Sequence, residues 1–104
     1  MDRRTPQGVL GATLSALAAR DLATLASLAR PGPLTVDDAE EARRRFLGPA
    51  TRRYWQRVAA ALGAGRYVVD EDEAGAWVRV DVGGAAGTYR LRLRRKGAQW
   101  FLAD

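Results

Sequence analysis

Apolar and polar residues alternate strictly along two segments in the last third of the chain. Ala or Val occupies every second position in residues 76–82, and Tyr or Leu does so from Tyr89 to Leu93. A period of two is typical of β-strands with one buried and one exposed face. Lys96-Gly97 offers a two-residue turn into a last strand, and a shorter first strand is expected over residues 66–70. The pattern therefore predicts a four-stranded antiparallel sheet.

Upstream of Gly63, apolar residues recur at the spacing of helices. Three of the predicted helices follow a residue type that commonly caps helices, namely Thr5, Asp21 and Thr35. The predicted helices run over residues 6–20, from residue 22 to the break at Pro31-Gly32-Pro33, from residue 36, and over residues 50–62.

Helices followed by strands predict an α+β fold, with the N-terminal helices packed on one face of a curved four-stranded antiparallel sheet. The chain has 104 residues, enough for one core, so we expect a single domain over residues 1–104. The first helix is expected to bury a stripe of Leu10, Leu14 and Leu17. The helix over residues 50–62 separates an apolar side from a polar side: Tyr54, Trp55, Val58, Ala61 and Leu62 against Arg52, Arg53, Gln56 and Arg57.

This order of elements resembles the nuclear transport factor 2-like superfamily, which has the cystatin-like cone fold. The segments that carry the resemblance are residues 14–28, 76–82 and 89–104, the last containing the Lys-Gly-x-x-Trp pattern. The most similar members are small bacterial ones with a lumazine-binding-like or uncharacterised domain. The resemblance implies helices in the concave face of a bent sheet, around a cone-shaped pocket. Some members place Asp, His or Tyr there for acid/base catalysis.

Composition removes several kinds of chemistry. The chain has no Cys and no His, so disulfides, thiolate catalysis and imidazole proton transfer are excluded. The acidic residues 70–73 lack the spacing of a calcium loop, and the glycine-rich residues 83–87 join two strands, which predicts a turn. We assign no catalytic residue, no metal ligand and no cofactor. We do not expect an enzyme, although a pocket isomerase or cyclase that works without histidine stays an alternative.

Aromatic residues are the candidates for a ligand pocket. Tyr54, Trp55, Tyr67 and Tyr89, together with Trp100, are expected between the last helix and the sheet. Such residues suit either a cavity for a small apolar ligand or an ordinary core. Aromatic residues at structural spacing usually pack, which favours the core.

Strand register provides candidates for an interface. A turn at Lys96-Gly97 pairs Leu93 with Trp100 and Arg92 with Phe101, and a four-residue turn at residues 83–86 pairs Val82 with Gly87 and Trp77 with Arg92. Trp100 is then expected to face the helices. Trp77, Arg92 and Phe101 form a row on the opposite face, beside Arg79. We expect this face to form a homodimer packed sheet to sheet, unless the arginines only cover the rings.

The net charge is +5, and Lys96 is the only lysine among the 17 basic residues. Abundant Arg, Ala and Gly have GC-rich codons, which indicates a bacterium with a high-GC genome. The charge also leaves nucleic-acid binding by the arginine-rich helix 50–62 as an alternative, with residues 43–45 assisting. Gln56 is the only base-reading amide there, which disfavours this alternative.

No apolar run in the sequence is long enough to span a bilayer. Residues 1–18 resemble a signal peptide, with Arg3 and Arg4 before an apolar stretch and Ala16-Leu17-Ala18 as a cleavage site. The competing interpretation is the amphipathic first helix, and we expect a cytoplasmic protein. We therefore predict a non-catalytic small-molecule-binding or protein-interaction module, in the form of a homodimer.

Overall fold

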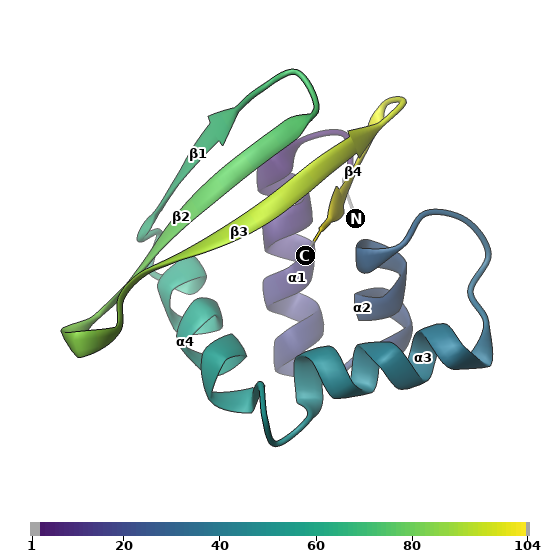
Figure 1. Cartoon of the computed structure of the whole chain (residues 1–104), viewed down its shortest axis with the longest axis horizontal. Helices are drawn as coiled ribbons and strands as arrows, with labels where there is room; N and C mark the ends of the chain where they lie inside the picture. The colour runs from purple at the N-terminus through teal and green to yellow at the C-terminus, as the bar shows by residue number, and fades with distance from the viewer. Residues whose placement is uncertain (1–2, 104) are drawn as a thin grey trace.

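The computed structural model describes residues 3–103. All helices precede the sheet, whose strands are antiparallel and lie in the order β1-β2-β3-β4, so the predicted α+β fold is confirmed (Figure 1). The helices are α1 (Pro6–Ala19), α2 (Leu22–Ala29), α3 (Val36–Ala42), which continues into a π-helical turn (Arg43–Leu47), and α4 (Arg52–Gly63). The strands are β1 (Tyr67–Glu71), β2 (Gly75–Gly83), β3 (Gly87–Lys96) and β4 (Gln99–Leu102).

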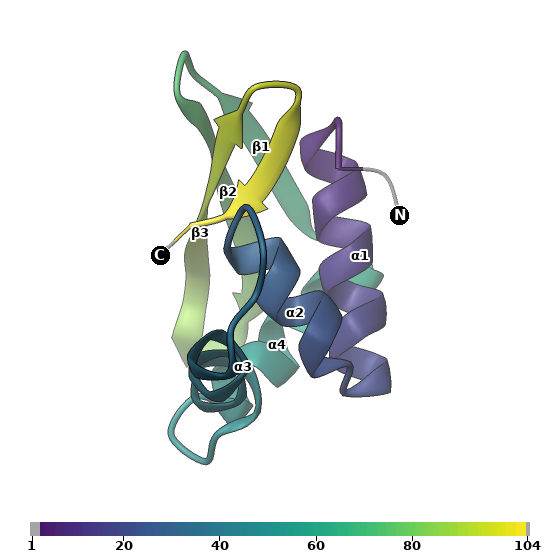
Figure 2. The ribbon, with the colours of Figure 1, turned by 90° about the vertical axis from the view of Figure 1, so that its right-hand side faces the viewer.

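The helices α1, α2 and α4 lie on one side of the sheet, and no helix or strand within residues 3–103 covers the other side of β2 and β3 (Figure 2). Alternation along β2 and β3 explains this arrangement, because Val78, Val80 and Leu93 are all 0% exposed against the helices. Burial of such side chains stabilises the fold by about 1.5–3 kcal/mol each. The sheet is therefore joined to the helices through one face only.

The three predicted N-caps are confirmed. The Thr5 side chain accepts a hydrogen bond from the Gly8 amide at 3.0 Å, and Asp21 caps α2 in the same way. Thr35 and Asp38 form a reciprocal capping box, in which the Asp38 carboxylate accepts from the Thr35 amide at 2.8 Å. Each cap satisfies amides that a helix start leaves unpaired.

The predicted leucine stripe of α1 is wrong in part. Leu10 is buried, but Leu14 and Leu17 are only half-buried, and the inward face instead carries Val9, Thr13 and Ala16. The reason is tertiary, because α1 contacts α2, α4 and β4 at once, and smaller side chains allow these close approaches. The Thr13 hydroxyl is satisfied within the helix by donating to the Val9 carbonyl at 2.8 Å.

The register of β2 and β3 is confirmed along most of its length, with Val78 opposite Leu91 and Trp77 opposite Arg92. It departs from the prediction near the turn, where Gly83 rather than Val82 lies opposite Gly87. Gly83 adopts a φ of 73°, a conformation that side chains rarely permit, and the Asp81 carboxylate accepts from its amide at 2.9 Å. These two features shift the register by a bulge.

The predicted register of β3 and β4 is wrong. Lys96 lies opposite Gln99, so the turn residues are Gly97 and Ala98. Gly97 has a φ of 62° and takes the first turn position, where a type II′ turn requires glycine. Phe101 consequently lies opposite Arg94 instead of Arg92.

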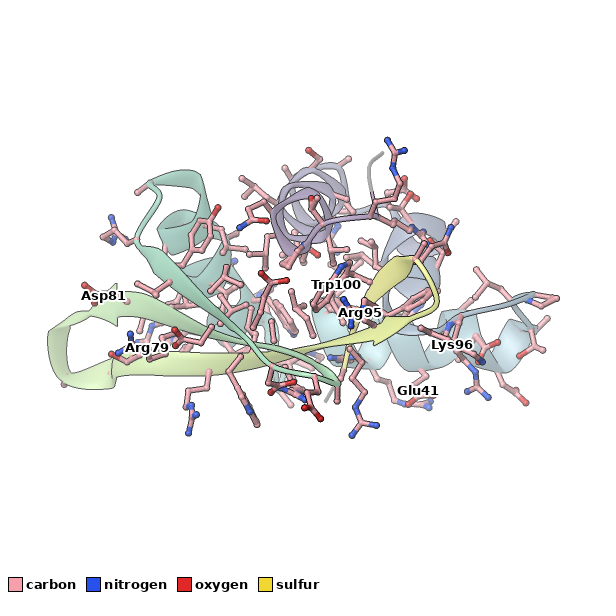
Figure 3. The ribbon with its side chains drawn as sticks, turned by 90° about the horizontal axis from the view of Figure 1, so that it is seen from above. Glu41, Arg79, Asp81, Arg95, Lys96 and Trp100 are labelled. Carbon is pink, nitrogen blue, oxygen red and sulfur yellow. The ribbon has the colours of Figure 1, made fainter. Side chains whose placement is uncertain are left out.

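This register differs from the expected one by two residues, which leaves each side chain on its predicted face. Trp100 therefore still points towards the helices, as Figure 3 shows, and is 3% exposed. It packs within the core that also contains Leu93 and Leu102.

Replacing Trp100 by Ala should lower the free energy of unfolding by about 3–5 kcal/mol, because a large buried side chain leaves a cavity. Urea denaturation followed by far-UV circular dichroism measures this loss. Gln99→Ala, an exposed change on the same strand, is the matched control and should change stability by less than about 0.5 kcal/mol. A loss below about 1 kcal/mol for Trp100→Ala would contradict its place in the core.

Candidate functional site

The bare side of the sheet is the most distinctive surface of the described chain, and we call it the outer face. It presents the alternate side chains of β1, β2 and β3 that point away from the helices. Its residues are Val68, Asp70, Trp77, Arg79, Asp81, Thr88, Arg90, Arg92 and Arg94.

Trp77 occupies the middle of the outer face. The ring is 38% exposed, and the guanidinium carbons of Arg90 and Arg92 lie 4.7 and 5.1 Å from its centroid. Val68, which is 49% exposed, is its diagonal neighbour on β1. Cation–π attraction to the two guanidinium groups compensates in part for the contact of the ring with water.

A carboxylate holds one of these arginines in place. Arg92 donates two hydrogen bonds to Asp72, from Nη1 at 2.8 Å and from Nη2 at 3.3 Å. Asp72 also accepts from the amides of Ala74 and Gly75 in the turn between β1 and β2. The Arg92 side chain is only 14% exposed, so Trp77 rests on a fixed guanidinium.

This hydrogen bonding also changes the acidity of Asp72. The bonds from Arg92, and then those from the two turn amides, hold the pKa of the carboxyl below its usual range. Asp72 is therefore ionised throughout the neutral range, as its bidentate contact with Arg92 requires.

Positive charge exceeds negative charge on the outer face. Asp72 pairs with Arg92, and Asp70 lies 3.4 Å from Arg79 in an exposed ion pair. Among the described residues no carboxylate forms an ion pair with Arg90 or Arg94.

The basic surface continues past Arg94. A cavity of about 500 Å³ between β3, β4 and the end of α2 is lined by Arg94, Arg95 and Lys96 together with Ala29 and Pro31. The outer face and this cavity are therefore suited to an acidic ligand.

The structure brings together three of the four predicted interface residues. Trp77, Arg79 and Arg92 share the outer face, as the alternation indicated. Phe101 is 7% exposed, and the Arg3 guanidinium carbon lies 6.0 Å from its ring centroid, so it is not part of the exposed row.

The sequence interpretation missed Arg90 and Asp72. Arg90 has the same parity as Arg92 on β3, a signal that was available in the alternation. Asp72 reaches its partner from a turn, which the strand pattern does not predict.

The predicted pocket residues pack against one another. The rings of Tyr54 and Tyr89 stack at 4.7 Å, and Trp55 meets Tyr54 edge to face at 5.1 Å. The Tyr89 hydroxyl accepts a hydrogen bond from Arg57 at 3.0 Å, while Tyr67 lies half-buried on β1. Burial raises the pKa of Tyr54, which makes its phenol a weaker acid than usual.

Trp55 also faces a groove on the other side of α4. Its indole N–H donates to the Arg45 carbonyl of the π-helical turn at 2.7 Å. The groove has a volume of about 270 Å³ and is lined by Leu14, Leu17 and Leu47 besides Trp55. Pockets for drug-sized ligands usually measure about 300–1,000 Å³, so this groove is small for such a ligand.

Neither a metal site nor a membrane-spanning helix is found in the part of the chain that the structure describes. In residues 3–103, no three Asp, Glu, His or Cys side chains are grouped so that they could hold a metal ion. Among the described helices, none is both long enough and apolar enough to cross a bilayer.

No protein family, curated protein or solved structure matches this chain. The resemblance to nuclear transport factor 2-like proteins consequently stays a prediction.

Iodide should quench the fluorescence of Trp77 much more strongly than caesium does, because the flanking arginines attract anions. Trp55 and Trp100 are 5% and 3% exposed and should contribute little. Stern–Volmer titrations check this, with Trp77→Phe expected to remove most of the iodide-sensitive emission. Equal quenching by the two ions would contradict the arrangement.

Asp72 should make folding stability depend on pH in the acid range. Its pKa in the folded state lies below the unfolded value of about 3.9, so its contribution is complete above that pH. The contribution is lost as the pH falls through the folded pKa. Urea midpoints at neutral and acid pH should therefore differ less for Asp72→Asn than for the wild type. Equal pH dependence of the two proteins would refute this role.

Proposed function

We propose that this protein is a non-catalytic interaction module that binds an acidic segment of another protein on the outer face. The observation that carries the proposal is Trp77, exposed on a bare sheet and flanked by Arg90 and Arg92. Trp and Arg are the residues most enriched at the energetic centres of protein interfaces.

The chemistry of the partner follows from the residues around Trp77. An apolar side chain of the partner packs on the strip formed by Trp77 and Val68. Carboxylates on either side of it reach Arg90 and Arg94, which have no carboxylate partner among the described residues. Arg92 is already held by Asp72, so its side-chain entropy is not lost again when the partner binds.

A foreign partner suits the outer face better than a second copy packed sheet to sheet. Face-to-face packing would bring Arg90 and Arg94 of one copy against the basic face of the other, and opposed like charges are unfavourable. The row that included Phe101, which motivated such a dimer, is absent because of the β4 register.

A pocket enzyme is less well supported. The stacked rings of Tyr54 and Tyr89 occupy the junction of α4 with the sheet, where Val58 and Val80 are 0% exposed. The raised pKa of Tyr54 moves it away from the neutral range that acid/base catalysis favours.

Nucleic-acid binding is the alternative that the binding experiment has to separate. Arg52 and Arg53 of α4 are exposed and would be available to phosphates. These two arginines lie on α4 and not on the outer face. Variants of the outer face and of α4 therefore distinguish the two kinds of ligand.

Binding is measured by fluorescence anisotropy at low salt, with a labelled peptide of alternating Glu and Gly that carries one central Leu. Trp77→Ala and the double variant Arg90→Ala/Arg94→Ala should each weaken binding at least about tenfold. The double variant Arg52→Ala/Arg53→Ala removes two exposed charges from α4 and should leave the affinity within about twofold.

Two outcomes would overturn the proposal. One is an equal loss of affinity in Arg52→Ala/Arg53→Ala, which would mean that only net charge matters. The other is that single-stranded oligothymidylate binds more tightly than the peptide and that Trp77→Ala weakens its binding to the same extent. This result would assign the outer face to nucleic acid.

A further inference from the structure

The free edge of the sheet is a second unpartnered surface. In the described sheet β1 has one neighbour, β2, and its other edge is open (Figure 1). No residue of β1 is fully buried, and Val68 is 49% exposed. The strand contains no proline, lysine or bulge, which are common devices against edge-to-edge pairing.

The hydrogen bonds with β2 show which backbone groups point outwards. The Asp81 amide donates to the Arg66 carbonyl at 2.9 Å, and the Asp72 amide donates to the Gly75 carbonyl at 2.8 Å. In an antiparallel pair the bonding residues alternate, so even-numbered residues of β1 face β2. The amides and carbonyls of Tyr67, Val69 and Glu71 therefore point to the open edge.

The charged side chains along this edge are arranged so that two antiparallel copies of β1 would be complementary. Arg66 precedes β1, Asp70 lies near its end, and Val68 is midway between them. All three point away from the helices, because they alternate with the half-buried Tyr67 and Val69. When a second copy of the strand is rotated by 180° about Val68, Arg66 of one copy lies opposite Asp70 of the other.

We propose that β1 pairs with β1 of a second copy of this chain, antiparallel and centred on Val68. In this register Arg66 lies opposite the second copy's Asp70, and Val68 lies opposite its counterpart. Tyr67 lies opposite the second copy's Val69. A two-fold axis relates the copies, so each contact occurs twice.

Backbone geometry supports this register. The two Tyr67–Val69 pairs use the outward amides and carbonyls, so they form the hydrogen-bonded pairs. The Val68 pair and the Arg66–Asp70 pairs then take non-hydrogen-bonded positions, where opposing side chains approach most closely.

The adjacent register, centred on Val69, is less favourable. It would place Val68 against the second copy's Asp70 and Tyr67 against its Glu71, which opposes apolar side chains to carboxylates.

Both residues of the proposed ion pair remain accessible in the single chain. Arg66 donates one bond, from Nε to the Asp81 carbonyl at 3.3 Å, and its side chain is exposed. Asp70 is 61% exposed, and its pair with Arg79 at 3.4 Å is a surface pair of small energetic value.

The dimer goes beyond the proposed function, because it pairs the open edge of the sheet and leaves Trp77, Arg90 and Arg94 of the outer face uncovered. The two-fold axis runs perpendicular to the sheet, so both copies keep their helices on one side. Two outer faces then lie side by side on the other, which would increase the avidity for a partner with repeated acidic segments.

Charge reversal at the edge tests the dimer. Arg66→Asp and Asp70→Arg each oppose like charges across the axis and should weaken dimerisation at least about tenfold in sedimentation equilibrium. An equimolar mixture of the two variants restores opposite charges at both ends, and so does the double variant Arg66→Asp/Asp70→Arg. Both samples should dimerise like the wild type. Arg53→Asp has the same charge change on α4 and should dimerise normally.

A wild-type protein that stays monomeric at roughly millimolar concentration would overturn the dimer, because even weak interfaces associate there. A dimer that persists unchanged in both single variants would place the interface elsewhere.

Amide exchange of the wild type provides a second measurement that needs no variant. With rising protein concentration the amides of Tyr67 and Val69 should become protected, while that of Val68 is protected at all concentrations. Protection that does not depend on concentration would refute the pairing.

Discussion

Burial of one face of the sheet is the constraint on which the other features depend. Val78 and Val80 on β2 and Leu91 and Leu93 on β3 point into the helices and are almost completely buried. Because side chains alternate along a strand, these residues force their neighbours to the opposite side. Trp77 lies between Ala76 and Val78, both 0% exposed, so its side chain points away from the core. Its exposure is therefore a consequence of the fold.

The exposed Trp77 ring is stabilised by contact with guanidinium groups and not by packing against another helix or strand. Arg90 and Arg92 lie over its ring, and Asp72 fixes Arg92 through two hydrogen bonds. This arrangement holds Arg92 in place and leaves Arg90 without a carboxylate partner among the described residues, so the surface is positively charged. The open edge of β1 has a different character, since Arg66 and Asp70 balance each other. The two surfaces consequently favour different partners, an acidic segment for the face and an identical strand for the edge.

The sequence was sufficient for the architecture because periodicity and capping are local signals. The alternation in β2 and β3 predicted both the sheet and the side on which Trp77 lies, and Thr5, Asp21 and Thr35 marked the helix starts.

Features that depend on backbone torsion or on distant contacts were not predictable in this way. The positive φ of Gly97 moved the last turn and with it the partner of Phe101. The contact of Asp72 with Arg92 joins a turn to a strand 20 residues away, and the periodicity of the sequence does not indicate such a contact.

The most direct test of binding on the outer face is a ¹⁵N NMR titration of the three tryptophan indole resonances with an acidic peptide. Binding on the outer face should shift the Trp77 resonance while those of Trp55 and Trp100 stay in place. Shifts confined to Trp55 would contradict it and locate binding in the groove between α1 and α4.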